Sequence, residues 1–458
     1  MKRQAGYIIF IAVFLLLCLV PSAGMLLADR GDGSSGANEV LSALPALRDG
    51  EGGFHADYLA QLSAYVEDNY FLRQELVTAW SALNHRVFRT SISEDVVLGR
   101  DGWLYFGGTL EDYTGSRPLD EGEIAGAARN LALMREYCEG LGARFLFTIA
   151  PNKNSMYPEH MPALPVFSAR RSADSLREAL AAEGVDYLDL FAVFGGQSET
   201  LYFPRDSHWN SRGAALAADS VNAALGRSSG YFSGPFSPQT VHRGDLYAML
   251  YPAGEELDTD MVYGGALEFT YDAPIRSAEN LTILTSGSRE GSLLMFRDSF
   301  GNLLYPYLAD SFGRALFSRA TAYRLNLAGE READCVVVEL VERNLRYLLE
   351  NVPVMPAPLR EAPEARAEGD TSVSLLAEPS QELDGYALVS GTLPWPPAPG
   401  GSILLRADSA CYEAFRLAEN GFGLYLPASA LAAGELSVVY DGAAVPVRMA
   451  PAESSSTN

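Results

Sequence analysis

The feature that most constrains the fold is an alternation of short apolar runs with helical patterns between residues 121 and 350. The helical patterns lie at 121–140, 168–183, 211–225, 301–312 and 341–350, and the apolar runs lie at 143–149, 185–190, 293–297 and 335–340. Short buried strands that alternate with helices predict an α/β fold, with a parallel sheet flanked by helices on both faces. Such sheets bind ligands at the carboxyl ends of their strands, so we expect the chemistry there.

The segments outside this alternation predict further parts of the chain. Residues 54–89 carry an amphipathic helical pattern, and an Arg-Asp-Gly turn at 100–102 separates two β-rich runs, which predicts a hairpin. Residues 230–280 predict a long irregular section. The predicted parts are an N-terminal transmembrane anchor or signal at 1–28, a linker at 29–53, a main α/β domain at 54–352, a proline-rich linker at 353–370, a β-sandwich at 371–450 and a disordered tail at 451–458.

The N-terminus predicts export. Lys2 and Arg3 precede an apolar run at 7–28, and about 20 such residues are enough to cross a bilayer. Basic residues at the start favour an N-terminus inside and a body outside. A cleaved signal peptide is the alternative, because residues 22–24 are small. Both interpretations predict an extracytoplasmic body, anchored to the cell membrane or secreted.

Charge and ligand spacing exclude several classes of protein. The net charge of −24 opposes binding to phosphate backbones, so no nucleic acid partner is expected. The five histidines and four cysteines show no metal-ligand spacing, so we expect neither a metal nor a cofactor. Cys138 and Cys335 lie in apolar contexts typical of buried free thiols rather than of a disulfide framework.

An aspartate and a histidine occur together just before the helical pattern at 211–225. The segment D-S-H-W-N-S places Asp206 and His208 in one loop, where Asn210 or Ser211 can cap the helix. A carboxylate beside an imidazole is the orienting half of a catalytic triad. The alternative is structural, with Asp206 capping the turn and His208 packed in the interior.

A serine follows the apolar strand at 293–297. Ser299 lies in the tight connection to the next helix, which exposes its hydroxyl at the carboxyl edge of the sheet beside the free backbone N–H groups of a helix start. Those donors can stabilise an oxyanion. A helix cap is the alternative role. Together the two segments predict Ser299 as nucleophile, His208 as base and Asp206 as its orienter.

Weaker candidates surround these three residues. Asn152 and Lys153 follow the strand at 143–149 and could donate to an oxyanion or an acyl donor. Arg297 precedes the serine, and Asn302 and Tyr305 lie in the first turns after it. A last group, for which a solvated ion pair is the favoured interpretation, consists of Glu339, Glu342 and Arg343.

Four motifs resemble those of a known family. They are D-S-H-W-N at 206–210, V-L-G-R-D-G-W-L-Y-F at 97–106, A-P-N-K-N-S-M-Y-P at 150–158 and F-R-D-S-F-G-N at 296–302. Over roughly 54–352 the chain resembles the AlgX/AlgJ alginate O-acetylation family, which is grouped with SGNH hydrolase-like and DHHW proteins. The shared order, with D-x-H before the serine, is more distinctive than any single motif.

The resemblance implies an O-acetyltransferase that acts on hydroxyls of an exported cell-envelope polysaccharide through an acetyl-serine. It implies Ser299, His208 and Asp206 as the catalytic residues, and a membrane-bound O-acyltransferase as the acetyl supplier. Some relatives carry a C-terminal carbohydrate-binding module. Candidates for sugar contact here, with core packing as the alternative, are Tyr386, Trp395, Tyr412 and Tyr425.

Two other functions stay open from the sequence. A carbohydrate esterase would use the same triad and pass the acetyl group to water instead of a sugar. A non-catalytic envelope or spore-assembly protein would keep the fold for binding polysaccharide.

Overall fold

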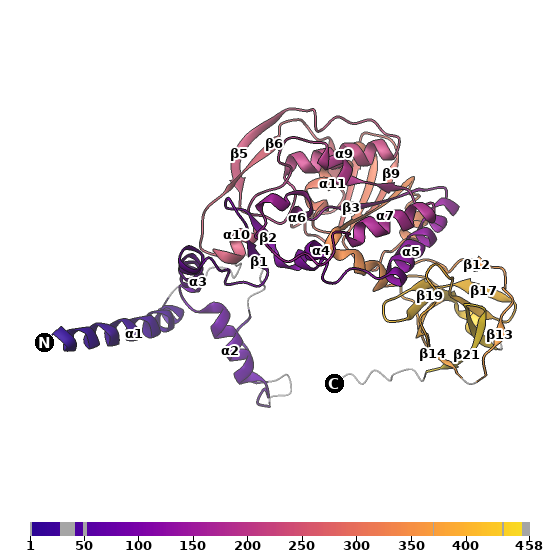
Figure 1. The fold of residues 1–458 in the computed structure, drawn as a ribbon, viewed down its shortest axis with the longest axis horizontal. Coiled ribbons are helices and arrows are strands. Elements are labelled where there is room, and N and C mark those ends of the chain that lie inside the picture. The colour runs from indigo at the N-terminus through magenta and orange to yellow at the C-terminus, as the bar shows by residue number, and fades with distance from the viewer. Residues whose placement is uncertain (1, 28–41, 49–52, 370, 433–434, 451–458) are drawn as a thin grey trace.

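The computed structural model describes residues 2–27, 42–48, 53–369, 371–432 and 435–450. Figure 1 shows N-terminal helices, an α/β body and a C-terminal β-rich region. Most of the predicted linker at 29–53 and the whole predicted tail at 451–458 lie outside the described residues.

The body is built on a seven-stranded sheet with the order β4-β3-β11-β9-β10-β8-β7. Its strands are β3 (Arg144–Ala150), β4 (Tyr187–Leu188), β7 (Phe269–Tyr271), β8 (Thr282–Gly287), β9 (Ser292–Phe296), β10 (Arg314–Ser318) and β11 (Cys335–Val341). The α/β prediction is confirmed, since the first five strands pair in parallel. The sheet is mixed at its other edge, where β8 is antiparallel to β10 and β7 to β8. Residues 272–281 are too few for the crossover that parallel neighbours need.

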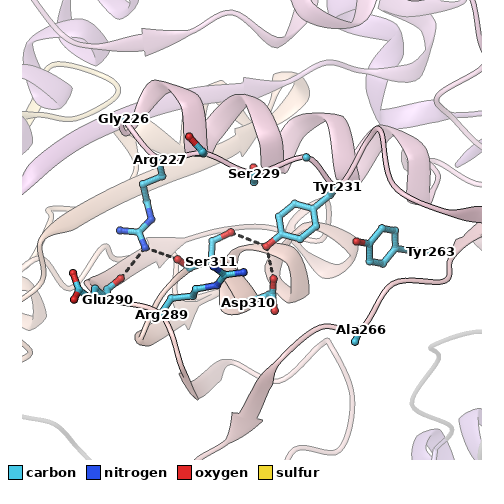
Figure 2. A pocket seen from close by; sticks show the side chains of 12 residues that line it. Gly226, Arg227, Ser229, Tyr231, Tyr263, Ala266, Arg289, Glu290, Asp310 and Ser311 are labelled. Carbon is cyan, nitrogen blue, oxygen red and sulfur yellow. Dashed lines mark hydrogen bonds between the residues drawn. The ribbon is translucent and has the colours of Figure 1, made fainter.

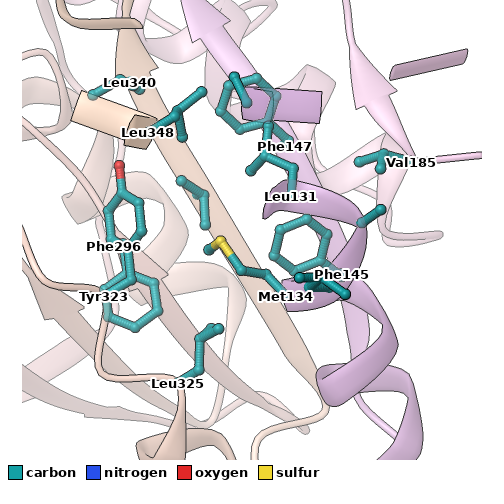
Figure 3. Close-up of a cluster of buried hydrophobic side chains, with 14 of the residues drawn as sticks. Leu131, Met134, Phe145, Phe147, Val185, Phe296, Tyr323, Leu325, Leu340 and Leu348 are labelled. Carbon is teal, nitrogen blue, oxygen red and sulfur yellow. The ribbon is translucent and has the colours of Figure 1, made fainter. Parts of the chain in front are cut away.

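Helices cover both faces of this sheet, as predicted. One face packs against α5 (Glu121–Gly140), α7 (Ser172–Ala182) and η4 (Glu342–Leu349), and the other against α8 (Leu190–Gly195), α9 (Ser211–Ala224) and α11 (Gly301–Ser311). Alternate residues of each strand point to opposite faces, so Phe145 and Phe147 join one core while Leu146 joins the other. Figure 3 shows the first core, where Phe145 and Phe147 lie beside Leu131 and Met134 of α5, and Phe296 lies beside Tyr323.

Two segments have a different secondary structure from the one predicted. The segment at 341–350 is a 3₁₀ helix, η4, rather than an α-helix. The section at 230–280 is not irregular, because β5 (Phe236–His242) pairs with β6 (Asp258–Tyr263) around α10 (Asp245–Leu250). Most side chains of β5 are exposed, so its strand lacks the apolar alternation that sequence patterns detect.

The N-terminal part contains α1 (Lys2–Leu27), α2 (Tyr58–Asn69), α3 (Arg73–Leu83) and a π-helical turn, η1 (Asn84–Phe88). Within the described part of the chain, no helix combines the length and apolar character that crossing a membrane requires. The predicted hairpin is confirmed as β1 (Val96–Leu98) paired with β2 (Leu104–Phe106). Short elements complete the body: η2 (Gly107–Thr109), α4 (Leu110–Thr114), α6 (Lys153–Met156), η3 (Pro158–His160) and α12 (Asn326–Glu330).

The C-terminal region is β-rich, as predicted, but its strands follow one continuous path. The strands are β12 (Leu359–Arg360), β13 (Arg366–Ala367), β14 (Val373–Pro379), β15 (Tyr386–Thr392), β16 (Leu404–Ala407), β17 (Ala410–Glu413), β18 (Phe415–Arg416), β19 (Gly421–Pro427), β20 (Leu436–Tyr440) and β21 (Ala443–Met449), with a short helix α13 (Ala428–Leu431). Because β21 pairs with both β20 and β14, it joins what a sandwich would keep as two sheets. The predicted linker at 353–370 contributes β12 and β13 to this sheet.

The three cysteines with described side chains fit the prediction of free thiols. Cys138, Cys335 and Cys411 are buried and unbridged.

Candidate active site

The turn after β9 holds Ser299 at the carboxyl edge of the sheet. The Asp298 carboxylate accepts hydrogen bonds from the backbone N–H of Phe300 at 2.8 Å and of Val341 at 2.7 Å. These bonds tie the turn between β9 and α11 to the end of β11, the strand that neighbours β9 in the sheet. Ser299 is therefore fixed in position while its side chain stays half-buried.

The loop that carries Asp206 and His208 is fixed from both ends. Asn210 caps α9, because its side chain accepts from the Gly213 N–H at 3.0 Å. A Cβ atom on Gly213 would lie 2.5 Å from the Leu201 carbonyl oxygen, so only glycine allows this close approach. The fully buried Trp209 packs edge-on against Phe300, with ring centroids 5.0 Å apart. This contact joins the loop directly to the turn that holds Ser299.

The structure brings the three predicted residues into a continuous hydrogen-bonded series. His208 Nε2 lies 2.8 Å from Ser299 Oγ, and His208 Nδ1 lies 2.8 Å from Asp206 Oδ1. Both distances fall within the range for a nucleophile and its base, and for a base and its orienting group. The arrangement can remove the serine proton and hold the resulting imidazolium beside a carboxylate.

The electrostatics of the series favour a charged Asp206. Burial alone would raise the pKa of Asp206, but the neighbouring His208 and His242 outweigh it and hold that pKa well below the usual range. Burial alone would lower the pKa of His208, but the charge and hydrogen bond of Asp206 outweigh it and raise that pKa. His208 is therefore a stronger base than a free imidazole.

Two residues that sequence reasoning missed complete the surroundings of Asp206. His242 Nε2 lies 2.9 Å from Asp206 Oδ2, and its ring stacks on Phe203 with centroids 3.7 Å apart. The Asp245 N–H donates to the same oxygen at 2.9 Å, and its carboxylate accepts from the Ser207 N–H and Oγ. Neither residue lay in a detectable motif, because both belong to the section predicted as irregular.

One cluster has the composition of a metal site. Asp206, His208 and Asp245 place ligand atoms within 4.8 Å of one another. These atoms already bond to protein partners, since Asp206 accepts from His208 and His242 while Asp245 accepts from Ser207. Hydrogen bonding within the protein therefore accounts for the cluster.

Ser299 and His208 open into a cavity of about 450 Å³. This volume lies in the range of small-molecule sites. Arg343, which the sequence had suggested as part of a solvated ion pair, lies in the cavity wall with its guanidinium over the rings of Phe106 and Phe300. Other wall residues include Phe203, Met249, Glu279, Asn302, Leu303 and Arg319.

The predicted residues next to Ser299 divide into two groups. Asn302 lines the cavity and bonds to Glu279. Arg297 lies behind it, buried, and donates to Asn302 Oδ1 at 2.6 Å and to the Ala278 carbonyl at 2.6 Å. Tyr305 is buried, with its hydroxyl 2.9 Å from that of Tyr271. Of these three predicted residues, Asn302 belongs to the described cavity wall, whereas Arg297 and Tyr305 do not.

Lys153 supports the triad loop from below instead of facing Ser299. Its side chain is 3% exposed, and Nζ donates to the carbonyl oxygens of Phe203 at 3.1 Å, Pro204 at 3.0 Å and Asp206 at 2.5 Å. Burial lowers the pKa of Lys153 to about 7. The hairpin motif supplies its aromatic surroundings, because Nζ lies 5.5 Å from the Trp103 ring centroid and 5.1 Å from that of Tyr105.

Asn152 also lies away from the nucleophile. Its backbone N–H donates to Glu342 at 3.0 Å and its amide to Asp112 at 3.3 Å. Glu342 and Glu339 are each 1% exposed, which corrects the expectation of a solvated group. Burial raises the pKa of Glu342 to about 7, that of Asp112 to about 6, and that of Glu339 well above its usual range.

Two of the four suggested sugar-contacting aromatics pack in cores. Tyr425 is buried against the body, and Trp395 packs on Tyr440 with centroids 5.1 Å apart. Tyr386 and Tyr412 are partly buried at the edges of these clusters.

Residues 96–258 match the family model of an SGNH hydrolase-like domain described as acetyltransferase AlgX. A probable alginate O-acetylase AlgJ from Pseudomonas syringae pv. tomato (strain ATCC BAA-871 / DC3000) is 26% identical over 283 residues, covering 57% of this chain and 67% of that protein. A second, from Pseudomonas fluorescens, is 23% identical over 217 residues, covering 46% of this chain and half of that protein. The family resemblance that the motifs predicted is thereby confirmed.

Solved structures of related proteins are similar at lower identity. A DHHW family protein from Eubacterium siraeum DSM 15702 is 16% identical, with a TM-score of 0.40 over 50% of this chain and 89% of its own. PatB1 from Bacillus cereus is 17% identical, with a TM-score of 0.41 over 55% and 97%. The O-acetyltransferase domain of Pseudomonas putida AlgJ is 17% identical, with a TM-score of 0.38 over 56% and 93%.

Proposed function

We propose that this chain, whose residues 96–258 match an SGNH hydrolase-like domain described as acetyltransferase AlgX, is an O-acetyltransferase. It transfers acetyl groups to hydroxyls of an exported cell-envelope polysaccharide through an acetyl-serine. The observation that carries the proposal is the position of His208, with Nε2 at 2.8 Å from Ser299 Oγ and Nδ1 at 2.8 Å from Asp206.

In the first step Ser299 becomes acetylated. His208 Nε2 takes the hydroxyl proton as Oγ attacks the carbonyl carbon of an acetyl ester or thioester. The bond from that carbon to the leaving group breaks, and the leaving group takes the proton from His208. Asp206 holds the imidazole in the required tautomer through Nδ1 and stabilises the imidazolium.

The developing oxyanion needs hydrogen-bond donors beside Ser299. The Phe300 N–H bonds to Asp298, and Asn152 is not among the residues of the cavity wall, so neither serves this role. We assign it to the Ser299 N–H and to the Asn302 amide, which lines the cavity and has a second N–H besides the one that bonds to Glu279.

In the second step a sugar hydroxyl accepts the acetyl group. His208 takes the hydroxyl proton, the sugar oxygen attacks the acetyl carbon, and Ser299 Oγ leaves and regains a proton from His208. The acceptor is then an O-acetyl ester and the triad is restored.

The proposed setting follows from the N-terminal sequence and from the relatives. The apolar run after Lys2 and Arg3 supports a body outside the cytoplasm, either anchored to the membrane by the N-terminal segment or secreted after its cleavage. The relatives named as alginate O-acetylases support a polysaccharide acceptor. A membrane-bound O-acyltransferase would supply acetyl groups.

The test is intact-mass analysis of the full chain after incubation with p-nitrophenyl acetate. We expect one added acetyl group, mapped to Ser299, on the wild type and none on Ser299→Ala. Addition of a sugar acceptor then separates transferase from esterase, because an esterase releases acetate and leaves the sugar unmodified. A folded wild type that neither acquires the group nor releases acetate would support a non-catalytic binding protein.

A further inference from the structure

A second pocket of about 560 Å³ lies on the other side of α10 from Ser299. We call it the distal pocket and define it by six of its residues: His85, Arg86, Arg205, Tyr247, Tyr251 and Glu256. The distal pocket shares walls with the cavity at Ser299 and His208, which we call the catalytic cavity. From α10, Asp245 and Met249 line the catalytic cavity while Tyr247 lines the distal pocket.

The triad loop contributes to both cavities in the same way. Phe203 and Asp206 line the catalytic cavity, whereas Pro204 and Arg205 line the distal pocket. A ligand in the distal pocket therefore lies against Pro204 and Arg205, which directly precede Asp206 in the chain.

The outer wall of the distal pocket is formed by α3 and by the π-helical turn η1 that follows it. Helix α3 docks beside α10, where the Ala253 N–H donates to Thr78 Oγ1 at 2.9 Å and His85 Nδ1 lies 2.6 Å from the Tyr251 hydroxyl. Figure 1 shows α3 next to α10. The turn that presents His85 and Arg86 is π-helical, a rare conformation that occurs frequently at functional sites.

The chemistry of the distal pocket suits a sugar ring. Tyr251 is partly exposed in its wall, whereas Tyr247 is buried beneath the Arg205 guanidinium, and the charged groups of Arg86 and Glu256 can bond to the hydroxyl and carboxylate groups of a sugar. Arg205 is held by Asp258 at 2.8 Å and by Glu256, and lies over the Tyr247 ring. Arg86 has no ion pair or hydrogen bond to the described residues, so its guanidinium is available to a ligand.

We propose that the distal pocket binds a sugar residue of the acceptor polysaccharide, away from the residue that is acetylated. The inference rests on the proposed acetyltransferase function and names its acceptor as a chain that occupies two cavities at once. A short acceptor reaches only Ser299, whereas a long one also gains the contacts of Tyr251 and Arg86.

A pocket at the opposite end of α11 offers a matched control. It encloses about 550 Å³ between Arg227, Tyr231, Tyr263, Arg289 and Asp310. Figure 2 shows that Tyr231 bonds to Asp310 and that Arg227 bonds to backbone carbonyls. Asp310 and Ser311 lie at the end of α11 remote from Ser299. Removal of an arginine there changes a pocket of similar size without altering the distal pocket or the catalytic cavity.

The experiment measures acetyl transfer by the full chain to an alginate disaccharide and an alginate decasaccharide, with p-nitrophenyl acetate as donor. We expect the wild type to prefer the decasaccharide. Arg86→Ala and Tyr251→Ala should raise KM for the decasaccharide about tenfold and leave KM for the disaccharide unchanged. Arg289→Ala should retain the wild-type preference, and acetyl-serine formation in each variant reports an intact fold.

The outcomes separate the two levels of inference. If both variants keep the wild-type preference for the long acceptor, the distal pocket is not an acceptor site and the acetyltransferase proposal stands. The same conclusion follows if the wild type transfers equally well to both lengths. If the wild type forms acetyl-serine but acetylates neither sugar, transfer to this acceptor and the distal pocket fall together. Absence of acetyl-serine overturns the proposed function itself.

Discussion

Asp206 is the residue on which most of the site converges. Its Oδ1 accepts from the His208 N–H and lies 2.8 Å from His208 Nδ1, and its Oδ2 contacts His242 and the Asp245 N–H. The lowered pKa of Asp206 keeps the carboxylate ionised, so both oxygens can accept in all four contacts. A single carboxylate thus fixes the histidine tautomer and joins the loop to α10.

The substitution Asp206→Asn removes the negative charge of the side chain and nearly keeps its shape, so it tests the contribution of the charge. In the asparagine an NH₂ group replaces one carboxylate oxygen and faces groups that donated to that oxygen. His208 then loses the charged acceptor that orients its ring, and Ser299 loses a correctly oriented base. We expect acetyl-serine formation to fall by roughly 10³ to 10⁴, as for other triads that lose this carboxylate. Rapid-quench measurement with p-nitrophenyl acetate checks it. Asp310→Asn, at the far end of α11, is the matched control, and an equal loss there would contradict the role given to Asp206.

The pH dependence of acetylation reports on His208. Only the neutral imidazole can take the serine proton, and Asp206 raises its pKa above the usual 6.5. The rate of acetyl-serine formation should therefore rise with pH through a midpoint above 6.5. In Asp206→Asn the residual rate should show a lower midpoint, because burial then acts without the compensating charge. A wild-type midpoint at or below 6.5 would argue against this pairing.

The three residues of the proposed triad could be predicted from the sequence because each lies in a local pattern. Asp206 and His208 precede a capped helix, and Ser299 follows a buried strand. His242 and Asp245 flank the start of α10, and Arg343 belongs to a 3₁₀ helix, so only the tertiary fold brings them near Ser299. Lys153 is a further example. The sequence places it after a strand, but the direction in which its side chain points depends on Trp103 and Tyr105 of the hairpin, which pack over it.

Elements with strong periodicity were predicted well, and exposed ones were not. Helix α5 begins at a capping box formed by Asp120 and Glu123, and β11 is buried at every position. By contrast β5 is mostly exposed, and β12 and β13 are two-residue strands whose pairing depends on distant partners. Local sequence carries little information about such strands, because their stability comes from the neighbouring strand.

Lys153 links three elements, and its replacement tests that link. In Lys153→Met the carbonyl oxygens of Phe203, Pro204 and Asp206 lose a buried donor, which should cost about 1–3 kcal/mol of unfolding free energy. Acetylation should slow as well, although the side chain does not line the catalytic cavity. Urea unfolding and the acetylation rate measure both effects. Lys153→Arg keeps a donor and should recover part of the rate, and a Met variant with wild-type kinetics would show that the loop needs no such support.

At the scale of the whole molecule, a buried polar network joins the C-terminal β-rich region to α5. The Glu413 side chain is 1% exposed and accepts two bonds of 2.8 Å from Arg129 and one of 2.6 Å from Arg360. Beside it, Asn130 bonds to the backbone of Arg416 in both directions at 2.8 and 2.9 Å. With β12 paired to β17, the segment predicted as a linker is part of this junction.

The network predicts that the body and the β-rich region unfold together. Glu413→Ala would leave Arg129 and Arg360 without their shared partner, although Arg129 keeps Glu183 and Arg360 keeps Glu136. The loss should cost about 1–3 kcal/mol and split a single calorimetric transition into two. Burial alone would raise the pKa of Glu413, but the two arginines outweigh it and lower that pKa. Its contribution is therefore present above the usual 4.5 and is lost as pH falls through the lower folded-state value. Glu178→Ala removes the exposed ion pair with Arg170 and should leave the transition unchanged. A Glu413→Ala variant that still unfolds in one transition at the wild-type temperature would mean that apolar packing alone joins the two regions.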